Sequence, residues 1–206
     1  MIRSLTLAAF LAAPAYADMV ELSDLAGEYT VTSARPFSHV AAPYDPDAPN
    51  PTGQTITFTE NGPEFPDTDC ENWSFSPVMI FIPPASDPNF ADLFVGHNHG
   101  MDYMLECEDT GSGMFLTHVD DRVLLLGIDN SAAGAVLEKP LTDEEVTLVQ
   151  AALVEMGLLD TASGEMDDAT HAAMRVHYRA LYDDGETGIP LRPAYTAHFL
   201  ATLGVE

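Results

Sequence analysis

The segment over 96–104, GHNHGMDYM, holds the side chains best suited to binding a metal ion. His97 and His99 form a His-x-His pair, and alternate residues of an extended strand point to the same side, so both imidazoles could bind one ion. Met101 and Met104 add thioether sulfur, a soft ligand that copper(I) accepts. A copper or zinc site is therefore one hypothesis. The alternative, which we favour, is a surface turn without a cofactor, because glycines flank the histidines.

A His-x-His pair also occurs in zinc peptidases that cut cell-wall peptides. Such an enzyme needs a further upstream histidine and aspartate as ligands, together with a base that activates the bound water. Only His39 with Asp45 or Asp47 supplies these upstream ligands, in a proline-rich stretch whose spacing does not match those enzymes. The sequence also has no Gly-x-Ser-x-Gly elbow and no phosphate-binding glycine loop. We therefore favour a non-catalytic protein, with a wall hydrolase or another enzyme of unfamiliar fold as the alternative.

The net charge of the chain restricts the molecules that it can bind. The 206 residues include 33 Asp and Glu against 7 Lys and Arg, for a formal net charge of −26. Such a field repels nucleic acids and anionic membrane surfaces, and no cluster of basic residues offsets it. Hydrophobic residues make up 46% of the chain, which is enough for a core and argues against disorder. The composition predicts a folded protein that binds no nucleic acid.

The amino terminus has the pattern of a secretory signal peptide. Arg3 gives a positive start, residues 5–13 are a short apolar run, and residues 15–17 (Ala-Tyr-Ala) form a small-residue cleavage box. We expect residues 1–17 to be removed and the mature chain to begin at Asp18, in the periplasm or outside the cell. No later stretch approaches about 18 apolar residues, so we expect no insertion into a membrane.

Cys70 and Cys107 are the two cysteines of the chain. In an oxidising compartment an isolated pair most simply forms one disulfide, and neither a Cys-x-x-Cys spacing nor a nearby basic residue suggests a reactive thiol. The bond would close a loop of about 37 residues and contribute on the order of 3–4 kcal/mol.

Residues 18–139 have the short alternating runs of an all-β domain. Pro, Gly, Asp and Asn separate the runs, and Asp120-Asp121 predicts a tight hairpin. Six to eight short strands favour a small antiparallel barrel or sandwich, whose ligand or protein partner is open. The expected strands are Gly27–Thr32, Gln54–Thr59, Trp73–Ile82, Tyr103–Glu106, Met114–His118, Arg122–Ile128 and Ala135–Glu138.

The string LAGEY over 25–29 resembles the first strand of lipocalin-like barrels, in which a Gly-x-aromatic begins the closure. The resemblance is confined to this string, and the expected fold stays a small antiparallel barrel or sandwich.

Lys139-Pro140 marks the expected boundary of a second domain over 140–206, because helical spacing replaces strand alternation there. Thr142 and Glu145 predict a capping box at the start of a first helix, and Gly157 fits a left-handed cap at its end. The apolar face expected for this helix is Val146, Val149, Leu153 and Met156.

Two more helices are expected after the first. Asp167 or Asp168 can begin the second, and Pro193 fits the first turn of the third. The buried stripe expected for the second helix is Ala169, Ala173, Val176 and Ala180, and that for the third is Tyr195, Phe199 and Leu203.

This carboxy-terminal third resembles the peptidoglycan-binding-like domain, a three-helix module. The chain departs from that pattern at Asp167-Asp168, where Gly-Pro is usual, at Tyr178, where glutamine is common, and in a longer stretch over 191–193. The matching residues are Leu141, Val149-Gln150, Leu153, Gly157-Leu158, Asp160, Gly164, Met166, Thr170, Ala173 and Thr187-Gly188.

The resemblance implies binding of wall glycopeptide. The candidate contacts are Leu158, Asp160, Arg175, Tyr178 and Tyr182, since rings stack on sugars and arginine grips carboxylates. The sequence thus predicts an α+β protein of two domains, an all-β barrel or sandwich followed by a three-helix bundle. Its expected role is to bind or sense the wall.

Overall fold

The computed structural model describes residues 20–38, 51–65, 70–78, 87, 89–94, 101–128, 133–182 and 193–205. The expected signal peptide, the upstream zinc-ligand candidates His39, Asp45 and Asp47, and the pair His97 and His99 lie outside these residues.

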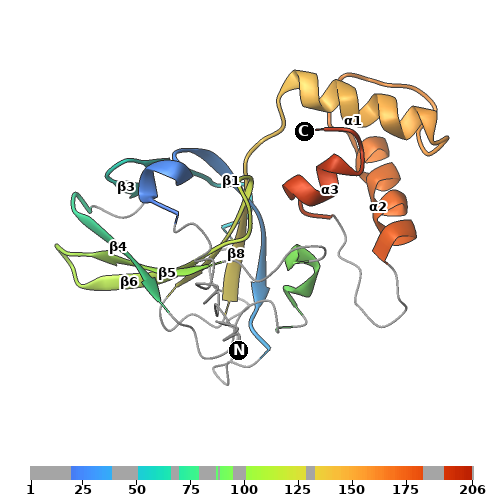
Figure 1. Ribbon diagram of the computed structural model, residues 1–206. Coiled ribbons are helices and arrows are strands. Elements are labelled where there is room, and N and C mark those ends of the chain that lie inside the picture. Colours follow the sequence, from blue (N-terminus) through green and yellow to red (C-terminus); the bar gives the residue numbers. More distant parts are fainter. Residues whose placement is uncertain are drawn as a thin grey trace, which may run out of the picture.

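Eight antiparallel strands form one sheet in the order β3-β2-β1-β8-β7-β6-β5-β4. The first long strand pairs with the last, and the edge strands β3 and β4 approach each other where Gly62 lies against the Trp73 indole, so the sheet is a nearly closed barrel (Figure 1). The strands are β1 Gly27–Pro36, β2 Thr55–Thr59, β3 Gly62–Glu64, β4 Trp73–Val78, β5 Asp102–Cys107, β6 Ser112–His118, β7 Val123–Ile128 and β8 Ala133–Glu138.

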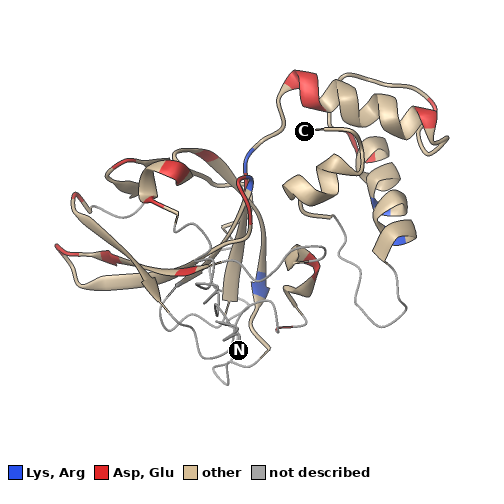
Figure 2. Ribbon diagram, in the orientation of Figure 1, with Lys and Arg blue, Asp and Glu red and all other residues tan. Residues whose placement is uncertain are grey.

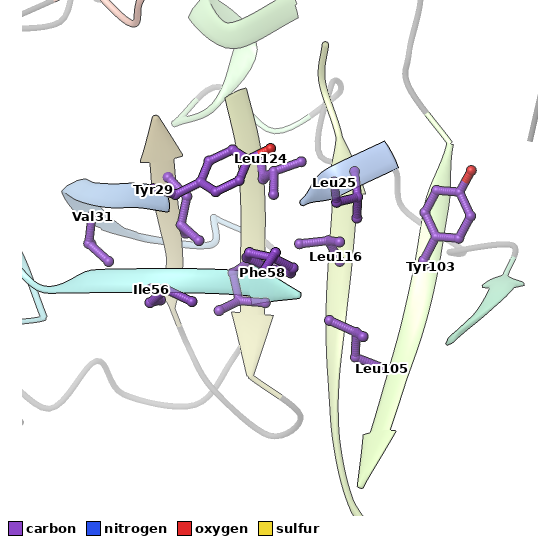
Figure 3. Close-up of a cluster of buried hydrophobic side chains, with 11 residues drawn as sticks. Leu25, Tyr29, Val31, Ile56, Phe58, Tyr103, Leu105, Leu116 and Leu124 are labelled. Atoms are coloured by element: carbon purple, nitrogen blue, oxygen red, sulfur yellow. The ribbon is translucent and has the colours of Figure 1, made fainter. Parts of the chain in front are cut away.

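Alternate strand residues fill the interior of this barrel (Figure 3). The ring of Tyr29 meets that of Phe58 edge to face at 5.4 Å, and Tyr103 stacks on Phe75 at 4.3 Å. An eight-stranded barrel is just wide enough for side chains to fill it, so its described interior is a core. The buried residues of this core are Leu25, Tyr29, Val31, Ile56, Phe58, Tyr103, Leu105, Leu116, Leu124, Leu126 and Leu137.

The outer face of β7 and β8 is buried as well. Val123 and Leu125 of β7 and Val136 of β8 pack against the short 3-10 helix η3 (Ala91–Phe94) and against Ala194. Burial on both faces explains why β7 reads as a continuous apolar run instead of alternating.

The carboxy-terminal part folds into α1 (Asp143–Glu155), α2 (Asp168–Tyr182) and the short α3 (Ala197–Ala201). The predicted capping box of Thr142 and Glu145 is present, and Gly157 has φ +71°, the left-handed conformation expected of the cap. None of the described helices is long and apolar enough to cross a bilayer.

Met156 is not part of the buried face of α1, because its side chain is 43% exposed. The helix ends at Glu155, and the N–H groups of Leu158 and Leu159 turn back to the Leu153 carbonyl. This turn brings Leu158 onto the helical core in place of Met156.

The stripe predicted for α2 is also wrong. Of its four residues only Ala173 is buried, whereas Val176 is 52% exposed. The helix instead turns its larger side chains, Met174 and Tyr178, toward the core, because they bury more apolar area. The remaining two exposed members of the predicted stripe are Ala169 and Ala180.

The third helix begins later than predicted. Thr196, not Pro193, stands at its start, where the Thr196 hydroxyl accepts from the Phe199 N–H at 3.1 Å. Tyr195, Phe199 and Leu203 are buried, as the spacing predicted.

Cys70 and Cys107 are joined, with 2.06 Å between their sulfurs and 5.9 Å between their Cα atoms. The bond ties the segment before β4 to the end of β5.

Candidate functional site

The predicted thioether ligands do not share a face. Met101 packs against the barrel core, whereas the Met104 sulfur lies on the opposite side of β5, beside Gly113. A strand places residues three apart on opposite faces, so these two sulfurs cannot bind one ion.

Within the described ranges, one group of side chains lies close enough to hold a metal ion. It consists of Cys70, Cys107 and Asp109, and the disulfide already uses both of its sulfurs. Asp109 is committed too, since it accepts from the Asn72 N–H at 3.2 Å. His118 lies elsewhere, 3.8 Å from the exposed Asp121 carboxylate, and burial lowers its pKa.

The candidate wall contacts differ in how they are placed. Asp160 is exposed, and Leu158 and Tyr182 are half-buried against the helical core. Arg175 is half-buried too, and its Nε has no hydrogen-bond partner among the described residues. These four side chains remain candidates.

Tyr178 differs from the other four, because it is only 6% exposed. Its ring meets Phe199 edge to face at 5.5 Å, and its hydroxyl donates to the Asp92 carbonyl at 3.3 Å. Burial raises the pKa of Tyr178 above its ordinary value. We therefore correct the prediction: Tyr178 is a core residue that joins α2 to η3, and it offers no open ring to a sugar.

Charged residues at one end of the barrel hold the helical part. Arg122, in the turn before β7, places Nη1 2.6 Å from the Glu145 carboxylate at the start of α1. Burial opposes the ionised form of Glu145, but hydrogen bonds from Thr142 and the charge of Arg122 outweigh it, so its pKa is lowered. Asp120 accepts from the Ala197 N–H at 2.6 Å. The starts of α1 and α3 are thus both anchored to the β6–β7 turn.

Glu138, at the end of β8, makes a third connection. It is only 3% exposed, and Oε1 accepts from the Thr32 hydroxyl at 2.5 Å while Oε2 accepts from the Tyr195 N–H at 3.0 Å. A buried carboxylate needs such donors, because leaving it unpaired costs several kcal/mol (roughly 3–5). The contact joins the barrel wall to the segment that leads into α3.

A cleft of about 290 Å³ opens at this junction. On the barrel side its wall is polar and comprises Thr30, Thr32, Glu138 and Lys139. The Lys139 ammonium lies 5.3 Å from the centre of the Tyr29 ring. Such a size is at the lower end of the range, roughly 300–1,000 Å³, of small-molecule pockets.

The opposite wall of the cleft is mostly apolar. Pro140, Leu141 and Met166 line it together with His171 of α2 and Tyr195. The imidazole Nε2 of His171 is 2.8 Å from the Tyr195 hydroxyl, so the helical wall presents a fixed polar pair at its edge.

A buried glutamine sets the position of Met166. Gln150 of α1 is fully buried, and its amide accepts from the Gly164 N–H at 2.8 Å and donates to the Glu165 carbonyl at 2.7 Å. It also donates to the Thr170 hydroxyl at 2.8 Å. Since an unpaired buried polar group is costly, this network fixes the turn that carries Met166 to the cleft.

Sequence reasoning missed this cleft. Thr30 and Thr32 are outward-facing strand residues of an ordinary kind, and the cleft joins them to His171 and Tyr195, more than a hundred residues later. No local spacing encodes such a meeting. The available signal was Glu138, a carboxylate in an otherwise apolar strand end (AVLEKP).

We predict that Glu138→Gln destabilises the protein by about 1–2 kcal/mol. An amide has one acceptor oxygen, so if that oxygen accepts from the Tyr195 N–H, the NH2 group faces Thr32, whose hydroxyl must turn from donor to acceptor. Both hydrogen bonds to a carboxylate then become weaker bonds to a neutral amide. Urea denaturation measures the change, and faster hydrogen exchange at the Tyr195 amide would locate it. Glu28→Gln, on an exposed position of β1, is the matched control. Equal stability of the two variants would contradict the role given to Glu138.

The chain matches no protein-family model, no curated protein and no solved structure at a significant level.

Proposed function

We propose that this is an exported, non-catalytic protein that binds the peptidoglycan wall through its helical part, while the barrel supplies a second binding surface. The observation that carries the proposal is the turn between α1 and α2. Gln150, Gly164 and Thr170, three residues of the resemblance to peptidoglycan-binding-like domains, belong to one buried hydrogen-bond network. That network supports the cleft wall at Met166.

Arg175 supplies the charged contact of this proposal. It stands one turn after His171 on α2, and residues four apart lie on the same face of a helix. Its side chain is half-buried on that face, and a guanidinium offers several N–H donors that can pair with a ligand carboxylate or carbonyl. The cleft at His171 and the guanidinium of Arg175 would then contact successive parts of one polymer.

Bulk charge cannot drive this binding, because the wall is also anionic and the chain carries a formal charge of −26. Hydrogen bonds and apolar contact must supply the affinity, while the long-range repulsion is screened by salt. We predict that the mature protein pellets with purified wall sacculi, and that moderate salt leaves the bound fraction unchanged or raises it. Cellulose particles, an insoluble polysaccharide without peptide, serve as the control. A mature protein that stays in the supernatant at every salt concentration would overturn the proposal.

Two arginine variants sharpen this experiment. Arg175→Gln should weaken the affinity for sacculi by roughly 10- to 100-fold, since a charge-assisted hydrogen bond contributes about 1.5–3 kcal/mol. Arg179→Gln removes the same charge from an exposed position of the same helix and should have little effect. Equal weakening in both variants would instead assign the effect to net charge.

A further inference from the structure

We infer that the cleft between the barrel and the helical part binds a single neutral N-acetylated sugar ring, so that neither part alone makes the site. The inference rests on the proposed wall-binding function and names the wall component that the cleft would hold.

The size of the cleft is the first argument. A volume of about 290 Å³ suits one sugar ring with a small substituent, and it is too small to enclose a longer segment of polymer. The cleft is partly open to solvent, so a glycan chain could continue outward from the bound ring.

The distribution of polar atoms is the second argument. A sugar ring has hydroxyl groups around its edge and an apolar face of C–H groups. The barrel wall offers the hydroxyl groups of Thr30 and Thr32, and the facing wall offers the apolar surfaces of Leu141 and Met166. An acetyl methyl group fits the apolar wall.

Charge selects the sugar over the stem peptides of the wall. Acidic residues are spread over the barrel hairpins and both ends of α1, with few basic residues among them (Figure 2). Glu138 lies in the cleft itself, and Lys139 is the one basic residue among the described residues that line it. The charges of Glu138 and Lys139 offset each other within the cleft while the surrounding field is negative, so a carboxylate-bearing peptide gains no net attraction there, whereas a neutral sugar ring needs none.

Calorimetric titration with N,N′-diacetylchitobiose, a neutral disaccharide of N-acetylglucosamine, tests the inference. The wild-type mature protein should bind it, and Thr30→Tyr should weaken binding at least tenfold by filling the cleft. Thr57→Tyr is the matched control, because Thr57 is a half-buried outward residue of β2 that does not line the cleft. Thermal melts verify that both variants fold. If Thr30→Tyr does not fold, Thr30→Val, which replaces the hydroxyl by a methyl group of similar size, is the milder variant.

The outcomes separate this inference from the proposed function. Sacculi binding without disaccharide binding, or tighter binding of a free wall stem peptide, would overturn the sugar assignment and leave wall binding intact. Disaccharide binding that Thr30→Tyr and Thr57→Tyr weaken equally would overturn the location. If Thr30→Tyr abolishes disaccharide binding and Thr57→Tyr does not, the result supports the cleft as the sugar-binding site, even if whole sacculi fail to bind.

Discussion

Replacing Gly62 by alanine is expected to destabilise the protein by about 2–4 kcal/mol, the sum of backbone strain and overpacking. Gly62 has φ +130°, a conformation that residues with a Cβ rarely adopt. A Cβ there would also lie 2.2 Å from Cδ1 of the Trp73 indole. The ring cannot move aside easily, because Phe65 packs on it with 5.9 Å between ring centres. Chemical denaturation of the folded protein would measure the loss.

Gly111→Ala separates the two causes. Gly111 also has a positive φ, +67°, but no atom lies within 4 Å of a Cβ placed there. This variant should therefore lose only the strain, about 1 kcal/mol. If both variants lose the same amount, the contact between β3 and β4 contributes nothing, and the edges of the sheet are not held together through Trp73.

The strands were predictable where one face is buried and the other is not. Residues 27–32 and 54–59 alternate in sequence; the first range forms part of β1, and the second contains β2 with one residue before it. The three residues of β3 were missed, because Gly-Pro-Glu has no alternation and proline is unusual in a strand. Its role depends on Trp73, and the sequence alone does not show that contact.

Helix ends were more predictable than helix faces. The capping box at Thr142 and the left-handed Gly157 depend on neighbouring residues only, and both are present. The buried face of α2 depends on its partners. Thr170 can be buried because its hydroxyl accepts from the Gln150 amide, and His177 can be buried because its Nε2 lies 2.9 Å from the Thr202 hydroxyl. Polar residues were therefore assigned to the wrong side of the helix.

The cleft shows the same limit in the candidate site. Each side of the cleft belongs to a part of the chain that was predicted correctly in outline. The contacts with peptidoglycan, however, were expected on the carboxy-terminal helical part alone. Arg122, Asp120 and Glu138 join the two parts at one end of the barrel, and these long-range contacts create the site. Patterns within a helix or strand carry no information about them.

Removing the disulfide should have an effect as large as that of the Gly62 substitution. The double variant Cys70→Ala, Cys107→Ala is expected to lose about 3–4 kcal/mol, because the bond closes a long loop and restricts the unfolded chain. For a protein of this size the melting temperature should fall on the order of 10 °C. Calorimetric melting of wild type and variant measures the change, and melting of the wild type after reduction should reproduce it.

Asp109 provides the comparison that isolates the covalent contribution. Its Oδ2 accepts from the Glu71 and Asn72 N–H groups at 3.1 and 3.2 Å, so it holds the same segment as Cys70 without a covalent bond. The Asn72 side-chain amide, which donates to Oδ1 at 3.3 Å, and these two backbone N–H groups hold the pKa of Asp109 below its usual range. Because Asp109 is exposed, Asp109→Ala should cost much less than the double cysteine variant. If its cost equals that of the cysteine variant, the segment before β4 is held by the native hydrogen bonds, and the loop-closure argument fails. A reduced wild type that melts at the temperature of the oxidised protein would contradict it as well.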